Sequence, residues 1–216
     1  MKTLFVCLAH WLEATNHHLA GIVVTRTDTG LSIARDEAGQ PRWIRPIVER
    51  GEAFPASVAG VQLRDLVEVE TLRAAAVAAP HQPENTLVDP DALLVVKALP
   101  LNAAYLDRLA NQEQTVLLGT PGGVVPAEAV GGLDHSLTFV RVRKARAYQS
   151  ESGVLRLRFL FGETFYDFPV TDAEFSQRHA LDPTLLSSPS EVFLSLALGA
   201  EEKGKYMKQV VGVIPV

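Results

Sequence analysis

The feature that most restricts the fold of this chain is a strict alternation of side chains in its second half. Apolar residues stand at every second position, with arginines between them: Leu155, Leu157, Phe159 and Phe161 alternate with Arg156 and Arg158. A period of two predicts a strand with one buried face. A polar turn over 149–153 precedes this strand, and Gly162-Glu163 leads directly into another strand over 164–170. The segment therefore predicts an antiparallel sheet of short strands.

The elements around this hairpin follow in an order that is typical of one architecture. A long strand is predicted over 137–148, and its apolar phase slips near Phe139-Val140, which suits a bulge. After the strand over 164–170, Thr171 is the predicted N-cap of a helix that ends near His179, because Glu174 stands three residues later. Strands over 191–198 and 206–214 close the chain. Three strands, a helix and two strands are the element order of the OB-fold, a five-stranded Greek-key barrel.

The first half is also rich in predicted strands, although periodicity does not give their order. Runs of strand length and composition cover 3–8, 19–26, 42–47, 63–72 and 92–99. A helix is expected over 100–112, with Asn102 capping its first turn. The loop 119–123 lacks the Lys-Ser/Thr pair of a phosphate-binding loop, so we interpret it as a turn. We therefore expect a helical connector over 100–134 between units at 1–99 and 135–216.

The charge of the chain is acidic overall and unevenly spread. The 216 residues include 20 Lys and Arg against 25 Asp and Glu, a net charge of −5. The stretch 141–158, by contrast, holds six basic residues against one acidic residue, a local charge of +5. This balance excludes a uniformly basic polyanion binder and indicates contact with a specific anion. The alternative is a solvated strand face whose arginine stems cover apolar surface.

Residues for catalysis or metal binding do not gather in the sequence. The single cysteine, Cys7, lies inside a predicted strand, where we expect a buried thiol, and it excludes a disulfide framework or a zinc site with several thiolates. His10, His17 and His18 have no carboxylate at a diagnostic spacing. Neither a compact carboxylate pair for Mg²⁺ nor a nucleophile elbow is present. The sequence thus assigns no catalytic residue, metal or cofactor.

The ends and apolar runs of the sequence bear on where the protein works. The first apolar run ends at Ala9 and is followed by His10 and Trp11, too early for a signal peptide. No apolar run approaches the roughly 20 residues of a membrane span. We therefore expect a cytoplasmic protein without a membrane partner.

Several segments together carry a resemblance to a known family. They are Cys7-Leu8-Ala9 with Ala20-Gly21-Ile22, Trp43-Ile44-Arg45-Pro46-Ile47, Leu66-Val67-Glu68-Val69, the stretch 81–89, and the stretch 165–172 with Ser195-Leu196 and Tyr206. In these segments the chain resembles the bacterial dual OB-containing domain family, most specifically at W-I-R-P and H-Q-x-E-N. The resemblance implies two OB-like barrels in tandem and a role with nucleic acid, and it supplies no reaction. Where family members tend to have a loop rich in Ser, Lys and Gly, this chain has residues 10–18.

The candidate binding residues form a basic hairpin, and the nearby aromatics that could stack bases are Tyr148, Phe161, Phe165 and Tyr166. The hairpin residues are Arg141, Arg143, Lys144, Arg146, Arg156 and Arg158. Like charges that face each other across a hairpin are unfavourable, and a phosphate backbone would relieve them. The slipped phase of the first strand leaves open which of them share a face. An acidic partner protein could supply the same relief.

Two tryptophans extend the candidate set. Trp43 and Arg45 stand two apart, so on a strand they share a face and could stack a base and hold a phosphate. The favoured alternative places Trp43 in the core and Arg45 on a carboxylate. Trp11, expected in an exposed loop, could stack on a base or pack on a barrel end.

A polar cluster next to two prolines remains, consisting of His81, Gln82, Glu84 and Asn85. We interpret it first as an ordered joint between the barrels, because such side chains satisfy neighbouring backbone groups. The alternative is readout of a base edge, since Asn and Gln can pair with adenine.

Together these observations predict a mainly β protein of two tandem OB-like Greek-key β-barrels with a short helical connector. The function we expect is non-catalytic binding of single-stranded DNA, single-stranded RNA or a nucleotide. The alternative is an adaptor that docks on a larger protein of a bacterial complex. A nuclease or hydrolase is the least favoured interpretation.

Overall fold

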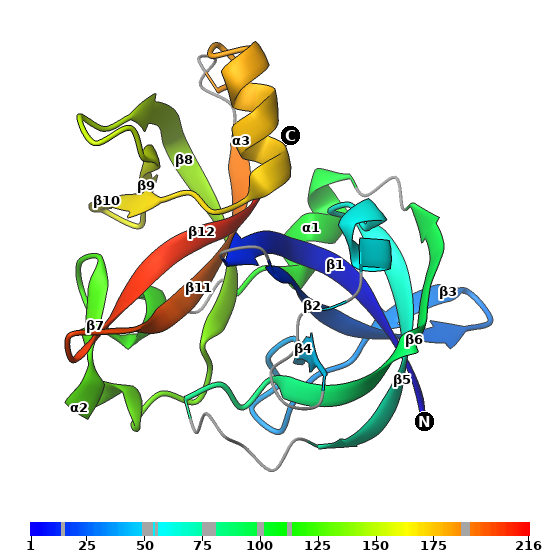
Figure 1. Ribbon diagram of the computed structural model, residues 1–216. Coiled ribbons are helices and arrows are strands. Elements are labelled where there is room, and N and C mark those ends of the chain that lie inside the picture. The colour runs from blue at the N-terminus through cyan, green and yellow to red at the C-terminus, as the bar shows by residue number, and fades with distance from the viewer. Residues whose placement is uncertain are drawn as a thin grey trace. The chain divides into compact units, whose positions relative to one another are not determined.

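The computed structural model describes residues 1–13, 16–48, 54, 56–74, 81–98, 102–111, 114–186 and 191–216. The chain divides into two compact units, Met1–Leu109 and Ala110–Val216, whose elements are labelled in Figure 1. The boundary falls inside the stretch 100–134 that the sequence predicts as a connector. Its helix belongs to the first unit, whereas the elements from residue 117 onward belong to the second. No helix among the described residues is both long and apolar enough to cross a membrane.

The first unit is a closed β-barrel followed by one helix. Its elements are β1 (Lys2–Glu13), β2 (Asn16–Thr27), β3 (Gly30–Ile33), β4 (Trp43–Ile47), the 3₁₀ helix η2 (Ala56–Gly60), β5 (Asp65–Ala74), β6 (Asn85–Ala98) and α1 (Ala103–Leu109). Five strands pair in the cyclic order β1-β2-β4-β6-β5, and β5 returns to β1. Only β4 and β6 run parallel, while β3 pairs with the end of β2 as an added hairpin strand. Closure with one parallel pair between the third and fifth barrel strands is OB topology.

The core of the first barrel is lined by inward-facing residues from its strands. It includes Phe5, Cys7, Leu19, Val23, Ile44, Val67, Val69 and Val88. Cys7 is fully buried, as the sequence predicts. The segment between β4 and β5 adds Phe54, Val58 and Val61 to this core. That segment occupies the place in the chain order where an OB-fold has its helix, and it closes one end of the barrel.

The second unit has the element order that the sequence predicts for 135–216. It consists of η3 (Leu117–Gly119), β7 (Val124–Pro126), α2 (Ala127–Val130), β8 (Leu137–Gln149), β9 (Leu155–Phe161), β10 (Thr164–Pro169), α3 (Ala173–Leu181), β11 (Val192–Glu202) and β12 (Lys205–Pro215). Its strands form one curled sheet in the order β10-β9-β8-β11-β12-β7 (Figure 1). The two sides of the curl meet at a single parallel bridge between Val170 and Val210. The unit is thus an OB-like barrel whose described residues close the curl at this bridge, directly after the end of β10.

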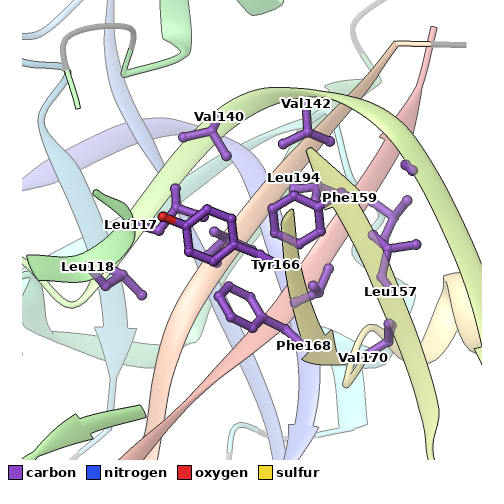
Figure 2. Packing of buried hydrophobic residues seen from close by; sticks show 14 of the residues in the cluster. Leu117, Leu118, Val140, Val142, Leu157, Phe159, Tyr166, Phe168, Val170 and Leu194 are labelled. Carbon is purple, nitrogen blue, oxygen red and sulfur yellow. The ribbon is translucent and has the colours of Figure 1, made fainter. Parts of the chain in front are cut away.

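Aromatic rings fill the core of the second unit. Figure 2 shows Phe159, Tyr166 and Phe168 gathered between aliphatic side chains such as Leu117 and Leu194. The rings of Phe159 and Phe168 meet edge to face with centroids 5.5 Å apart. Because Phe159 comes from β9 and the other two rings come from β10, this cluster fixes which face of the hairpin points inward.

Two local predictions in the second unit are wrong in their position. The N-cap of α3 is Asp172, whose carboxylate accepts the Phe175 amide, whereas the hydroxyl of Thr171 donates to the Val210 carbonyl. The bulge of β8 lies at Lys144, with φ +54°, and not near Phe139-Val140. The apolar phase slips at 139–140 because both faces of β8 are buried there, and Phe139 stacks on Phe193.

The helix predicted from residue 100 is shorter than expected. The described helix α1 covers Ala103–Leu109, and the Oδ1 atom of Asn102 accepts the Tyr105 amide at 2.9 Å. The predicted cap is therefore confirmed. Residues 99–101 and 112–113 lie outside the described residues.

Candidate nucleic-acid interface

The outward face of β8, β9 and β10 carries most of the basic hairpin. Strand pairing places Arg146 opposite Arg158, Arg158 opposite Asp167, and Tyr148 opposite Arg156. The residues that alternate with these, among them Ala145 and Leu157, are buried in the core. The sequence left open which basic residues share a face of the hairpin, and the strand register answers this. The bulge at Lys144 brings Arg143 and Arg146 to the same side of β8.

One arginine of this face is held by internal partners. The Nε atom of Arg156 donates to Asp167 Oδ1 at 2.6 Å, and its Nη2 donates to the Asp167 carbonyl at 2.9 Å. The hydroxyl of Tyr148 donates to the other oxygen of the same carboxylate. Burial opposes the charge of Arg156, but the hydrogen bond and charge of Asp167 raise the pKa of Arg156 above its ordinary value. These three residues brace the three strands and leave little of Arg156 for a ligand.

Two other arginines lie exposed opposite each other, and one of them contacts an aromatic ring. The guanidinium of Arg158 lies 5.1 Å from the ring centroid of Phe165, and that residue is 51% exposed. Arg146 is exposed on the neighbouring strand. Within the described part of the chain, neither Arg146 nor Arg158 forms an ion pair with a carboxylate, and Asp167, which stands opposite Arg158, is bound to Arg156 and Tyr148. We call Arg146, Arg158 and Phe165 the arginine face.

The remaining basic residues of the hairpin have different surroundings. Arg141 forms an ion pair with Glu191 and lies over the ring of Phe193, with its guanidinium 5.9 Å from the centroid. Arg143 donates a long hydrogen bond of 3.4 Å to the Gly162 carbonyl. Lys144 is exposed at the bulge. The structure therefore brings Arg143, Arg146, Arg156 and Arg158 to one face of the sheet. Arg141 instead contacts Glu191 and Phe193, at the start of β11.

In the first unit, Trp11 and Arg45 meet in a buried stack. The guanidinium of Arg45 lies 5.4 Å from the Trp11 ring centroid, and Trp11 stacks on His18 at 5.1 Å. Trp11 and Arg45 are 3% and 4% exposed. Of the two interpretations of Trp11, the structure agrees with packing and not with an exposed loop, because β1 continues to Glu13 and only residues 14–15 lie between it and β2.

The buried charge of Arg45 has acidic residues around it. Burial lowers the pKa of Arg45, and the negative charges of Glu84 and Glu13 act in the opposite direction. Burial likewise lowers the pKa of His18. Of the pair expected to share a ligand, only Trp43 is accessible: it is half-buried and lines a pocket.

The polar cluster at 81–85 lies within the first unit, at the turn that leads into β6. The side-chain amide of Asn85 donates to Gln82 Oε1 at 3.1 Å, and the Glu84 carbonyl accepts the Arg45 amide at 2.8 Å. His81 belongs to the same turn. The cluster therefore fastens the start of β6 to β4, the parallel pair that closes the barrel.

The histidines of the first hairpin bond to each other. His10 Nε2 lies 2.8 Å from His17 Nδ1, and His10 Nδ1 lies 2.8 Å from the Val61 carbonyl oxygen. Both ring nitrogens of His10 are thereby occupied, and burial lowers its pKa. Among the described residues, no group of three or more His, Cys, Asp or Glu side chains is arranged to hold a metal ion.

Two residues that matter at the arginine face are suggested by the sequence only in general terms: Phe165 as one of four aromatics that could stack a base, with Tyr148, Phe161 and Tyr166, and Asp167 for a structural role near the start of the helix. Phe165 is one of several aromatics near the hairpin, and its exposure follows only from the register that sets Tyr166 inward. Asp167 neutralises Arg156 rather than Arg158, although it stands opposite Arg158 in the ladder. A signal was present in the alternation over 164–170, in which odd positions face outward.

The family comparison agrees with this architecture. The family model described as "Dual OB-containing domain" matches residues 3–213. The comparison with curated proteins finds no match. Among solved structures, the chain is similar to a murine DNA binding protein bound with double-stranded DNA, with 9% identity, 100% of this chain and 96% of that chain covered, and a TM-score of 0.37. Because the family model spans both barrels, the chain belongs to the dual OB-containing domain family.

Proposed function

We propose that this protein binds single-stranded nucleic acid, without catalysis, on the arginine face of its second unit. The observation that carries the proposal is the exposed ring of Phe165 beside Arg158, with Arg146 opposite Arg158 on the next strand and no carboxylate partner for either arginine among the described residues. An aromatic plane stacks a base of any identity, and neighbouring guanidinium groups contact the phosphates on either side.

The position of this face within the fold supports the same function. Strands β9 and β10 are the second and third strands of an OB-like barrel, and OB-folds bind oligonucleotides across that face. Arg146 and Arg158 stand directly opposite each other, an arrangement that costs free energy unless an anion lies between them. A phosphate of the strand supplies that anion.

The geometry favours single strands over duplex. Stacking on Phe165 requires a base that is free to leave its neighbours, and the bases of a duplex are already stacked and paired. The membership in a dual OB family agrees with a nucleic-acid role and leaves the choice between DNA and RNA to experiment.

Fluorescence anisotropy with labelled oligothymidylate, single-stranded RNA and duplex DNA tests the proposal. We expect the wild-type protein to bind the single strands more tightly than the duplex. Phe165→Ala removes the stacking plane, so its affinity should fall by about tenfold or more, because one stacked base contributes roughly 1–3 kcal/mol and 1.4 kcal/mol is tenfold. Leu181→Ala is the matched control, because Leu181 is an exposed apolar residue at the end of α3.

Two results would contradict the proposal. One is the absence of binding to every oligonucleotide at low salt, which would leave an adaptor role as the function to test. The other is equal binding by the wild-type protein and Phe165→Ala while Arg146→Gln/Arg158→Gln also binds normally. Circular dichroism of each variant confirms that the fold is retained.

A further inference from the structure

The first barrel contains a pocket that the arginine face does not explain. It has a volume of about 470 Å³, and its wall includes Thr3, Arg42, Trp43, Thr71, Glu84 and Thr86. Val23 and Ile44, which belong to the barrel core, also line it. These residues come from all five barrel strands and the turn before β6, so the pocket is the open end of the barrel.

The chain order explains why this end is open. The segment with Phe54, Val58 and Val61 lies between the end of β4 and the start of β5, and it closes that end of the barrel. The pocket lies at the opposite end, where β4 starts at Trp43 and where β5 passes Thr71 before it ends. An OB-fold has one such helical plug, so its second end needs another cover.

The second unit covers its equivalent end with its own chain. There β12, the fifth barrel strand, begins beside β7, and Val125 pairs with Tyr206. Leu117, Leu118 and Val130 from the same stretch enter the core. The fully buried Lys208 of β12 holds this segment in place. Its ammonium group donates to the Leu117 carbonyl at 2.7 Å and to the Thr120 carbonyl. The two barrels thus differ at this end: one is covered by residues 117–130, and one has a pocket.

The residues that line the pocket indicate which class of ligand it can bind. Trp43, half-buried at the wall, provides a plane for a flat ring. The hydroxyl groups of Thr71 and Thr86 donate to the Met1 and Glu84 carbonyls, so their oxygens can accept hydrogen bonds from amino groups at the edge of that ring. Exposed Arg42 adds a positive charge at the wall. The volume lies within the range of roughly 300–1,000 Å³ that small-molecule sites have. A flat heterocycle with hydrogen-bonding edges and one attached anion meets all of these conditions.

We propose that this pocket binds one mononucleotide, with its base stacked on Trp43 and its phosphate paired with Arg42. The nucleotide is either free or the phosphorylated end of a strand, since both present the same base and phosphate. The site lies entirely in the first unit and does not depend on the arginine face.

Tryptophan fluorescence provides a direct test. The chain has two tryptophans, and Trp11 is only 3% exposed, so quenching by a bound base reports Trp43. We expect saturable quenching by GMP, AMP or UMP, and none by ribose 5-phosphate, which lacks the base. Calorimetric titration with the same compounds gives a readout that does not rely on the indole.

Variants separate the two parts of the site. Trp43→Ala should weaken nucleotide binding in the calorimeter by about tenfold, the usual loss for one stacked base. Arg42→Gln should weaken binding of the nucleotide and leave binding of the matching nucleoside unchanged. Because Arg42 is exposed, this variant keeps the proposal testable even if Trp43→Ala fails to fold. Arg26→Gln, which removes an exposed arginine of β2 outside the pocket wall, is the charge-matched control.

The source of the nucleotide is resolved in the Arg146→Gln/Arg158→Gln background, where the arginine face is disabled. Binding of a 5′-phosphorylated oligonucleotide but not of its 5′-hydroxyl form, with no binding of free nucleotides, identifies a strand end. Binding of free nucleotides identifies the small molecule. The inference is overturned if neither binds at millimolar concentration, or if Arg42→Gln lowers nucleotide and nucleoside affinity equally. Either failure leaves the result for Phe165→Ala unaffected.

Discussion

At the residue scale, Asp172 shows how one buried carboxylate joins a helix to a strand. One of its oxygens accepts the Phe175 amide at the start of α3, and the other accepts the Val213 amide of β12, both at 2.9 Å. Burial raises the pKa of Asp172 to about 6, while these two amides act in the opposite direction. Between pH 4 and pH 6 the folded protein therefore holds a proton that the unfolded chain has released.

This proton gives the stability of the second unit a definite pH dependence. Asp172 contributes most to stability below its unfolded pKa near 4, and that contribution is lost as the pH rises through about 6. The loss amounts to about 3 kcal/mol over this window. We expect the free energy of unfolding of the wild type, relative to Asp172→Asn, to fall by that order between pH 4 and pH 7. Urea unfolding followed by circular dichroism measures it, and a difference that stays flat or rises with pH would contradict the assignment.

At the scale of elements, the sequence predicts strands well where one face is buried and poorly where both are. The alternation over 155–161 gives β9, and the turn after it gives β10, so the OB order of the second unit follows from local pattern. Around Trp11 the polar neighbours favour a loop in the sequence and hide a strand in which Trp11 is buried and Leu12 and Glu13 are exposed. The arginine face could not be derived in full, since a single bulge at Lys144 decides which arginines lie together. Pairing register, and not composition, determines that site.

The close pairing of β1 with β2 depends on Gly21, which stands opposite Cys7. A Cβ atom at Gly21 would lie 2.0 Å from the Val6 carbonyl oxygen and 2.6 Å from the Phe5 ring. We expect Gly21→Ala to destabilise the first unit by about 3 kcal/mol or more, because backbone atoms cannot move aside cheaply. Gly60→Ala meets no atom within 4 Å and should stay within about 1 kcal/mol of the wild type. Tryptophan fluorescence during urea unfolding reports this unit, since Trp11 and Trp43 both belong to it. Equal midpoints for the two variants would refute the argument.

At the scale of the whole molecule, an acidic chain is proposed to bind an anionic strand. The net charge of −5 repels the strand at long range, so attraction must come from local contacts. Screening by salt weakens both effects, and a single affinity cannot separate them. A comparison of variants with equal net charge separates the local contacts from the field of the molecule.

Arg146→Gln/Arg158→Gln and Arg26→Gln/Arg178→Gln both remove two positive charges and shift the net charge from −5 to −7. Arg178 lies on α3, paired with Glu174 at 3.8 Å, and belongs to none of the strands that form the arginine face. For single strands, the logarithm of the affinity falls with the logarithm of the salt concentration by about 0.7 for each phosphate neutralised. If Arg146 and Arg158 each contact one phosphate, their loss should flatten this slope by about 1.4, whereas the control pair should lower affinity slightly and keep the slope. Anisotropy titrations at a series of salt concentrations measure both slopes. Equal slopes for the two double variants would mean that the two arginines act only through the net charge, and the arginine face would then not be the place where the strand binds.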